Sequence, residues 1–440
     1  MSIEPNDVHK ILSKYILVDG FNLVLDLKKS KGCQIYDSRE GKYFLDCFSF
    51  FATAPLGCNH PKLTTSNFIK KLGEVAVNKP TNSDVYTVEM AEFVDSFINY
   101  AVPSFFKHLF FVSGGALAVE NGLKTAFDWK IRKNIEKGKG DKLGTKIIHF
   151  KEAFHGRTGY TLSMTNTFNQ NKTKYFTMFD WPRIINPKIT FPLNDNNLNK
   201  VKQLEKKAIS EIEKAVNENP DDIAALIIEP IQGEGGDNHF RKEFFHQLRR
   251  LCDDYEMMFI LDEVQTGVGL TGKMWAFEHF DFQPDILAFG KKTQVCGIMV
   301  NNRVDEIEEN VFKVSSRLNS TWGGNLVDMV RCQKYLEVID EENLIKNAVV
   351  QGKRLLNGLE ETAEKYTNKI SNARGLGLMC AFDLPTPKER DEFKDKLYNN
   401  GLLVLSCGSN TIRFRPPLII SSEEIDEALE IIDKTIKAFK

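Results

Sequence analysis

Residues 258–292, MFILDEVQTGVGLTGKMWAFEHFDFQPDILAFGKK, contain two short apolar runs that each end in polar residues. The runs MFILD (258–262) and DILAFG (285–290) have the length and composition of buried strands. Further runs of this kind are HLFFV (108–112), KIIHF (146–150), AALIIE (224–229) and GIMV (297–300). Amphipathic stretches alternate with these runs, so the chain is predicted to form a mainly parallel sheet with crossover helices, an α/β layer structure.

A crossover helix is predicted from FRKEFFHQLRRLCDDYE (240–256), which places Phe244, Leu248 and Leu251 on one helical face. The pattern changes after about residue 325, where a long helix is predicted over 331–366. Short strand-like pieces around GLGLMCAFDL, LLVLS and TIRFR and a C-terminal helix follow, which together indicate a smaller α+β lobe. We therefore expect an N-terminal segment (1–60) packed on the two lobes, a large domain (61–325) and a small α+β domain (326–440).

The composition is that of an enzyme-sized globular protein. The chain has 440 residues, 42% of them hydrophobic, which is enough to bury a large core. Because 58 Lys and Arg face 60 Asp and Glu, no global field attracts nucleic acid or an anionic membrane. No apolar run or N-terminal signal predicts a membrane span or export. The eight cysteines are scattered without a CxxC pair, so no metal site is predicted. We expect a cytoplasmic protein with small-molecule partners.

Polar residues directly after the apolar runs are the first candidates for chemistry, because open α/β sheets bind ligands at the carboxyl ends of their strands. Asp262 ends one run, and a buried carboxylate there needs a partner such as a cationic ring nitrogen. A helix cap or a turn would also explain it. Lys291 and Lys292 follow the next run. Burial lowers the pKa of a lysine toward the range where it forms a Schiff base, although a surface pair would be unremarkable.

A third strand end carries paired glycines before a helix, in SGGALAVENGLKTAFDWK (113–130). Backbone N–H groups at such a helix start can hold a phosphate, and a structural Gly-Gly turn explains the pattern equally well. An amine, an acid and a helix start are the three parts that pyridoxal phosphate requires of a protein. Their occurrence in one sheet makes that cofactor the leading hypothesis.

The chain resembles the class III (fold type I) pyridoxal-phosphate aminotransferases along nearly its whole length. The resemblance is carried by residues 109–130, by AFHGRTGYTLSMTNT (153–167), IIEPIQGEGGD (227–237), residues 259–280, ILAFGKKTQVCG (286–297), STWGGN (320–325) and IRFRPPL (412–418). NKPTNSDVYTVEMAEFV (78–94), FGKKTQVCG and STWGGNLVDMVR are most similar to the lysine 6-aminotransferase subgroup. The resemblance implies a large domain with a mainly parallel seven-stranded sheet and a smaller α+β domain.

The resemblance also implies which residues hold the ring of the cofactor. Lys291 matches the family's Schiff-base lysine, with Lys292 as its rival. Asp262 matches the partner of the pyridine nitrogen, and Gln265 the contact to the ring hydroxyl. Phe154 stands where the family stacks an aromatic ring on the cofactor.

Four more positions match cofactor contacts or their neighbours. Gly115 and Ala116 match the turn that holds the phosphate, and His155 lies beside the stacked ring. Thr321 matches a hydroxyl that reaches the phosphate in the other subunit, which implies a homodimer with shared active sites. Ser113 departs from the pattern, since an acidic residue is expected there.

The substrate contacts implied by the resemblance are mostly charged. Arg157 matches the arginine that grips the distal carboxylate, and Glu234 matches the switch that neutralises a second arginine near the reaction centre. That second arginine is Arg413 by alignment. Arg415 lies two residues further on a predicted strand and faces the same way, so spacing alone leaves both open. Asn319 is a further candidate for a substrate contact.

The implied reaction is the transfer of the ε-amino group of L-lysine to 2-oxoglutarate, which gives 2-aminoadipate 6-semialdehyde and L-glutamate. Another ω-aminotransferase, with ornithine or 4-aminobutyrate as donor, is the nearest alternative. A decarboxylase or aminomutase on the same fold is a more distant alternative. Glu234 and Arg413 argue against it, because a switch that adapts the site to two different substrates serves little purpose in a one-substrate reaction. Lys291 and Asp262 disfavour a non-catalytic protein that only binds the cofactor.

Overall fold

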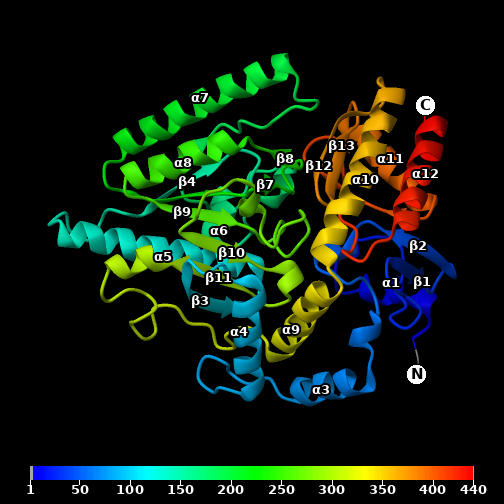
Figure 1. Ribbon diagram of the computed structural model, residues 1–440, viewed down its shortest axis with the longest axis horizontal. Helices are drawn as coiled ribbons and strands as arrows, with labels where there is room; N and C mark the ends of the chain where they lie inside the picture. The colour runs from blue at the N-terminus through cyan, green and yellow to red at the C-terminus, as the bar shows by residue number, and fades with distance from the viewer. Residues whose placement is uncertain (1–2, 440) are drawn as a thin grey trace.

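The computed structural model describes residues 3–439 (Figure 1). Its α-helices are α1 (Val8–Leu12), α2 (Ser49–Ala52), α3 (Ser66–Val77), α4 (Val88–Ala101), α5 (Gly115–Glu136), α6 (Gly159–Met164), α7 (Asp195–Glu218), α8 (Lys242–Asp254), α9 (Leu326–Glu341), α10 (Leu344–Lys365), α11 (Pro387–Asn399) and α12 (Ser422–Ala438). Its strands are β1 (Gln34–Asp37), β2 (Lys42–Asp46), β3 (Phe106–Val112), β4 (Lys146–Phe150), β5 (Arg183–Ile184), β6 (Ile223–Ile228), β7 (Ile231–Gln232), β8 (Asn238–His239), β9 (Met258–Asp262), β10 (Ile286–Phe289), β11 (Cys296–Asn301), β12 (Ser371–Leu376), β13 (Met379–Asp383), β14 (Leu402–Leu403), β15 (Leu405–Cys407) and β16 (Thr411–Phe414).

A seven-stranded sheet forms the centre of the larger part of the molecule, in the order β3-β11-β10-β9-β6-β4-β5. The pairings from β10 to β5 are all parallel, and β11 runs antiparallel to both of its neighbours. The predicted α/β class with a mainly parallel seven-stranded sheet is therefore confirmed. All six predicted strands are present, and β4 and β9 have the predicted bounds.

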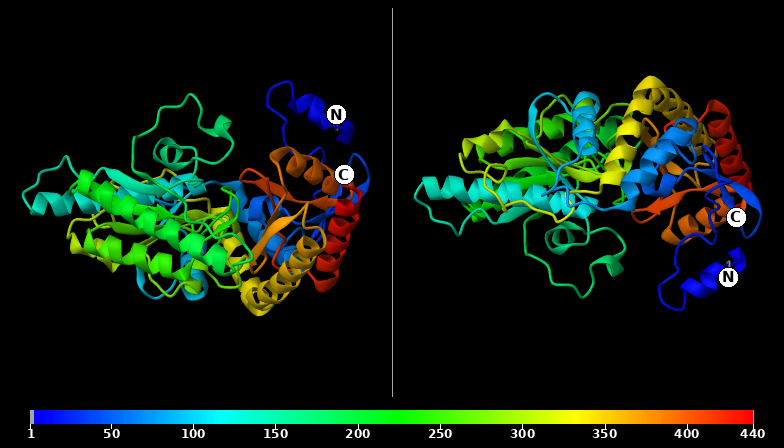
Figure 2. Two further views of the ribbon diagram at one scale, coloured as in Figure 1. Left: turned by 90° about the horizontal axis from the view of Figure 1, so that it is seen from above. Right: turned by 90° about the horizontal axis from the view of Figure 1, so that it is seen from below.

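Alternate side chains of the central strands belong to two separate cores, one on each face of the sheet. Ile227 and Ile260 pack with the apolar side of α5, including Leu123. Leu226 and Phe259 lie in the other core, which includes the apolar face of α8. Because both faces are covered by helices, the central strands are mostly apolar and do not alternate between apolar and polar residues (Figures 1 and 2).

The long helix predicted over 331–366 is wrong in one respect, because the chain breaks there into α9 and α10. Asn343 separates the two helices and has left-handed backbone angles, with φ 53° and ψ 41°. Asparagine tolerates this conformation better than most residues, so the helix can end and restart without a longer loop. The predicted crossover helix over 240–256 is confirmed as α8, with Phe244 and Leu248 fully buried.

The C-terminal part of the chain forms an antiparallel four-stranded sheet, β12-β13-β16-β15, with α10, α11 and α12 around it. A third sheet joins the two ends of the sequence, since β2 pairs with β14 in parallel through Leu45 and Leu402 (Figure 1). β16 brings the segment with Arg413 and Arg415 to the carboxyl ends of the central strands. No helix within residues 3–439 is long and apolar enough to cross a membrane.

Candidate active site

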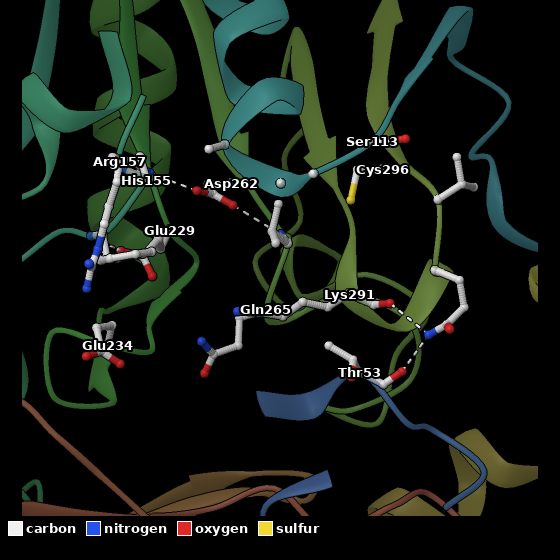
Figure 3. A pocket seen from close by; sticks show the side chains of 18 of the residues that line it. Thr53, Ser113, His155, Arg157, Glu229, Glu234, Asp262, Gln265, Lys291 and Cys296 are labelled. Carbon is white, nitrogen blue, oxygen red and sulfur yellow. Dashed lines mark hydrogen bonds and ion pairs between the residues drawn. The ribbon is translucent and has the colours of Figure 1, made fainter. Parts of the chain in front are cut away.

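A cavity of about 620 Å³ lies at the carboxyl ends of β3, β6, β9 and β10 (Figure 3). These four strands run in the same direction within one sheet, so the residues that follow them meet at one edge. The lining residues are Thr53, Ser113, Gly114, Gly115, Ala116, Phe154, His155, Gly156, Arg157, Glu229, Glu234, Asp262, Val264, Gln265, Lys291, Gln294, Val295, Cys296 and Asp328.

The two adjacent lysines after β10 have different surroundings. Lys291 lines the cavity and begins a 3-10 helix with a left-handed φ of 53° (Figure 3). Burial lowers the pKa of Lys291 to about 8, with Arg413 acting in the same direction and Asp262 in the opposite one. Lys292 is fully buried outside the lining, and its Nζ donates to the carbonyl oxygen of Gln265 at 2.7 Å. The geometry therefore presents Lys291, and not Lys292, to a ligand.

The carboxylate of Asp262 is oriented by two donors at the tip of β9. One oxygen lies 2.9 Å from Nδ1 of His155, and the other accepts from the backbone N–H of Val264 at 3.1 Å. Asp262 is 6% exposed and lines the cavity, and the His155 side chain is fully buried behind it (Figure 3). This fixed acid faces the same space as Lys291, as a charged ring nitrogen would require.

Glu229 is a second acid that sequence reasoning did not single out. It directly follows β6, and its carboxylate accepts from the backbone N–H groups of Phe154 and Gly233 at 3.0 and 3.1 Å. Burial raises the pKa of Glu229 to about 7, with Asp262 adding to the rise and His155 opposing it. An acid at the end of a wholly apolar run was the available signal, since the same pattern marked Asp262.

The start of α5 closes another side of the cavity. Gly114 has φ 111°, a conformation that side chains disfavour, and Gly115 begins the helix. A Cβ on Gly115 would stand 2.8 Å from Cγ1 of Val264, so a larger residue would have to displace the Val264 side chain. Gly115 and Ala116 both line the cavity, and the first turn of a helix leaves backbone N–H groups without intrahelical partners. This arrangement can accept a phosphate.

Arg413 lies in β16 and Arg415 directly follows it, and the two arginines have different carboxylate partners. Arg413 donates from Nη2 to Oε2 of Glu234 at 2.6 Å, while Arg415 donates from Nη1 to Oδ2 of Asp237 at 2.9 Å. Both also approach Oε1 of Gln265, Arg415 at 3.0 Å and Arg413 at 3.5 Å. Of the two carboxylates, Glu234 lines the cavity and Asp237 does not, so Arg413 is the arginine whose carboxylate partner a ligand can replace.

Glu234 has a second cation that the sequence did not reveal. Nζ of Lys172 bonds its other carboxylate oxygen, Oε1. Burial alone would raise the pKa of Glu234, but Arg413 and Lys172 outweigh burial and lower it. Glu234 is therefore an anion held between two positive charges.

The remaining predicted site residues lie at the edge of the cavity or away from it. Arg157 is exposed on the lining, and it makes no ion pair among residues 3–439. Phe154 lines the cavity next to His155. Asn319 and Thr321 are exposed and are not part of the lining in the single chain.

The chain belongs to the class III aminotransferases, because the family model Aminotransferase class-III matches residues 15–436. Members of this class depend on pyridoxal 5'-phosphate. The cavity fits that group, since it combines a lysine of lowered pKa, an oriented buried acid and a glycine-lined helix start.

Within the class, the chain is similar to proteins named L-lysine-epsilon aminotransferase. It is 50% identical to the one from Mycobacterium tuberculosis (strain H37Rv) over 97% of this chain and 95% of the relative. It is 45% identical to the one from Streptomyces clavuligerus over 99% of this chain and 95% of the relative. The solved structure of a lysine aminotransferase from M. tuberculosis in the internal aldimine form superposes with a TM-score of 0.97 at 49% identity, covering 100% of both chains.

Proposed function

We propose that the chain transfers the ε-amino group of L-lysine to 2-oxoglutarate, giving 2-aminoadipate 6-semialdehyde and L-glutamate. The observation that carries the proposal is the ion pair of Glu234 with Arg413 beside the cavity that Lys291 lines. Identities of 45–50% to proteins named L-lysine-epsilon aminotransferase, over nearly the whole chain, support the same donor.

The two substrates place their carboxylates differently, and the ion pair suits both. L-Lysine, entering by its ε-amine, brings an apolar chain to the reaction centre, where a free Arg413 would be an unpaired buried charge. Glu234 neutralises that charge. Glutamate brings its α-carboxylate close to the reacting carbon, where it can replace Glu234 on Arg413. The attraction to be replaced is about 4 kcal/mol at ~4 Å and an effective dielectric near ~20, before desolvation.

The remaining roles follow from the positions of the side chains around the cavity. Bound pyridoxal phosphate supplies an electron sink for the bond changes at the carbon that carries the amine. Asp262 would keep the ring nitrogen protonated, with His155 holding its carboxylate in place. Nζ of Lys291 would hold the cofactor and later move a proton at the substrate carbon, a role that its lowered pKa favours. Arg157, exposed on the lining, would bind the distal carboxylate of either substrate.

We further propose that the enzyme is a homodimer in which Thr321 and Asn319 complete the site of the partner subunit. Both residues lie outside the cavity of their own chain. Large apolar side chains are exposed around them and around the segment that leads into α4, namely Val77, Val85, Tyr86, Val88 and Trp322. Exposed apolar groups of this size commonly lie in protein interfaces.

A donor screen with purified protein tests the reaction. We expect glutamate to form from 2-oxoglutarate with L-lysine at a much higher kcat/KM than with ornithine or 4-aminobutyrate. Activity with either of the latter and none with lysine would contradict the assigned donor and leave the class unchanged.

Glu234 would act as a gate, because it covers Arg413 until a substrate carboxylate replaces it. This role is tested separately with Glu234→Ala. We expect the lysine half-reaction to lose at least about tenfold in rate while the glutamate half-reaction loses less, because only lysine leaves Arg413 without a substrate partner. Equal losses in the two half-reactions would count against the gate.

A further inference from the structure

Glu234 lies between two cavities. Besides the large cavity, it lines a smaller one of about 120 Å³, which we call the rear cavity. The rear cavity is lined by Thr167, Phe168, Asn169, Lys172, Glu234, Arg390, Ser406, Cys407 and Gly408. Its residues come from the segment between α6 and β5, which extends away from the body of the molecule in Figure 2, and from α11 and β15.

Two cations line the rear cavity, a partly buried lysine and a buried arginine. The side chain of Lys172 is 13% exposed, bonds Glu234 and lies over the ring of Phe154, with Nζ 5.5 Å from its centroid. Arg390 is 9% exposed. Its Nε lies 2.8 Å from Oδ1 of Asp391 in an ion pair, but at an angle that makes no hydrogen bond among the residues described. Nη1 of Arg390 donates to the carbonyl oxygen of Cys407 at 3.5 Å, so the N–H at Nε is the donor that remains for a carboxylate.

We propose that the rear cavity receives the Glu234 carboxylate when a substrate α-carboxylate occupies Arg413, with Lys172 as the counter-ion that stays paired with it and Arg390 as a second. This inference rests on the proposed gate and adds the place to which the gate opens. Lys172 is thus a positioning residue for the glutamate half-reaction.

The net charge around Glu234 favours the open gate when Lys172 is present. Arg413, Lys172 and Glu234 together carry one net positive charge, so an incoming carboxylate makes the group neutral. Without Lys172, the closed gate would be neutral and the arriving carboxylate would leave one net negative charge. A displaced carboxylate without a partner in a partly buried site is unfavourable, so the gate would open less readily.

The backbone allows this movement without a larger rearrangement. The carbonyl oxygen of Glu234 accepts from the N–H of Gly408 at 3.0 Å, which fixes the main chain beside the rear cavity. The side chain is 23% exposed and already contacts Lys172 on that side. In the proposed movement the Glu234 side chain rotates from Arg413 toward Lys172 while this main-chain bond is kept.

The test compares two unreactive acids on the loaded enzyme. Glutarate offers both carboxylates of glutamate, and hexanoate offers only the distal one. In Lys172→Met we expect the Kd of glutarate to rise about tenfold and the Kd of hexanoate to change by less than about twofold. Arg390→Gln should act in the same direction but more weakly.

Matched variants separate this role from a structural one. Lys174→Met, an exposed lysine of the same segment, should leave both Kd values unchanged. Lys172→Arg should restore the affinity for glutarate. In the Glu234→Ala background, Lys172→Met should have no further effect on glutarate, because no carboxylate remains to be moved.

Half-reaction rates measured separately give the second readout. The glutamate half should slow in Lys172→Met while the lysine half keeps its rate. Equal weakening of glutarate and hexanoate, or an undiminished effect in the Glu234→Ala background, would overturn the inference and assign Lys172 to the distal carboxylate instead. If Glu234→Ala slows both half-reactions equally, the proposed gate itself is wrong. If Glu234→Ala affects mainly the lysine half but Lys172→Met slows both halves equally, the gate stands and only the proposed role of the rear cavity is wrong.

Discussion

At the scale of single residues, the assignment of the cofactor lysine depends on which way two neighbours point. Lys291 opens to the cavity, and Nζ of Lys292 is held by backbone carbonyl oxygens. We expect Lys291→Ala to lose the visible absorbance band of the Schiff base between protein and cofactor, which differs from the band of free pyridoxal phosphate. Lys292→Met, the matched control, should keep the absorbance and lose stability instead. A Schiff-base band that persists in Lys291→Ala would move the role to Lys292.

The lowered pKa of Lys291 predicts how cofactor capture depends on pH. Only the neutral amine reacts with an aldehyde, so the rate of capture by the apoenzyme should rise with pH and level off above about 8, the pKa of Lys291. An ordinary lysine, with a pKa of 10.5, would keep accelerating through that range. Arg413→Leu removes a cation that disfavours the ammonium form, so it should move the midpoint upward. A midpoint near 10.5 in the parent protein would show that neither burial nor Arg413 lowers the pKa of this amine.

The sequence could predict candidates at strand ends but not partners that come from distant segments. An acid or an amine directly after an apolar run is visible in the residues themselves, as with Asp262 and Lys291. The choice between Arg413 and Arg415 depends on contacts to Glu234 and Asp237, across more than 170 positions of the chain. Lys172 lies in a segment without regular apolar spacing, and nothing local indicates that its amine reaches Glu234.

At the scale of elements, the break between α9 and α10 is decided by one backbone conformation. Asn343→Val should destabilise the protein by about 1–2 kcal/mol, because a β-branched residue is strained at positive φ. Asn343→Gly should be nearly neutral, since glycine adopts this conformation freely. Thermal unfolding midpoints of the two variants measure the difference. Equal midpoints would show that the left-handed turn is not required.

Apolar runs buried on both faces were the reliable signal for the fold, because helices cover the sheet on each side. The wholly apolar β6, and β9 with its apolar run before Asp262, were predicted nearly to the residue for this reason. Helix boundaries that no glycine or proline marks were harder to predict from the sequence, as the two-residue link at Asn343 shows. The domain boundaries at 60 and 325 stay a prediction.

At the scale of the whole molecule, the proposed dimer predicts that two inactive variants restore each other. If Thr321 serves the partner's site, a mixed dimer of Lys291→Ala and Thr321→Asp has one site with both defects and one with neither. Unfolding and refolding the two proteins together should return about a quarter of the parent activity, since half of the dimers are mixed. Mixing two preparations of Lys291→Ala is the control. No recovery above the controls would place Thr321 outside the partner's site.

The parallel pairing of β2 with β14 has a consequence for how the polypeptide matures on the ribosome. Leu45 is synthesised early, and its register partner Leu402 emerges only when translation is nearly complete. At roughly 5–20 residues per second, the leading segment waits many seconds without its strand partner. The third sheet therefore cannot close until almost the whole chain has been made, so this sheet is among the last parts of the molecule to fold.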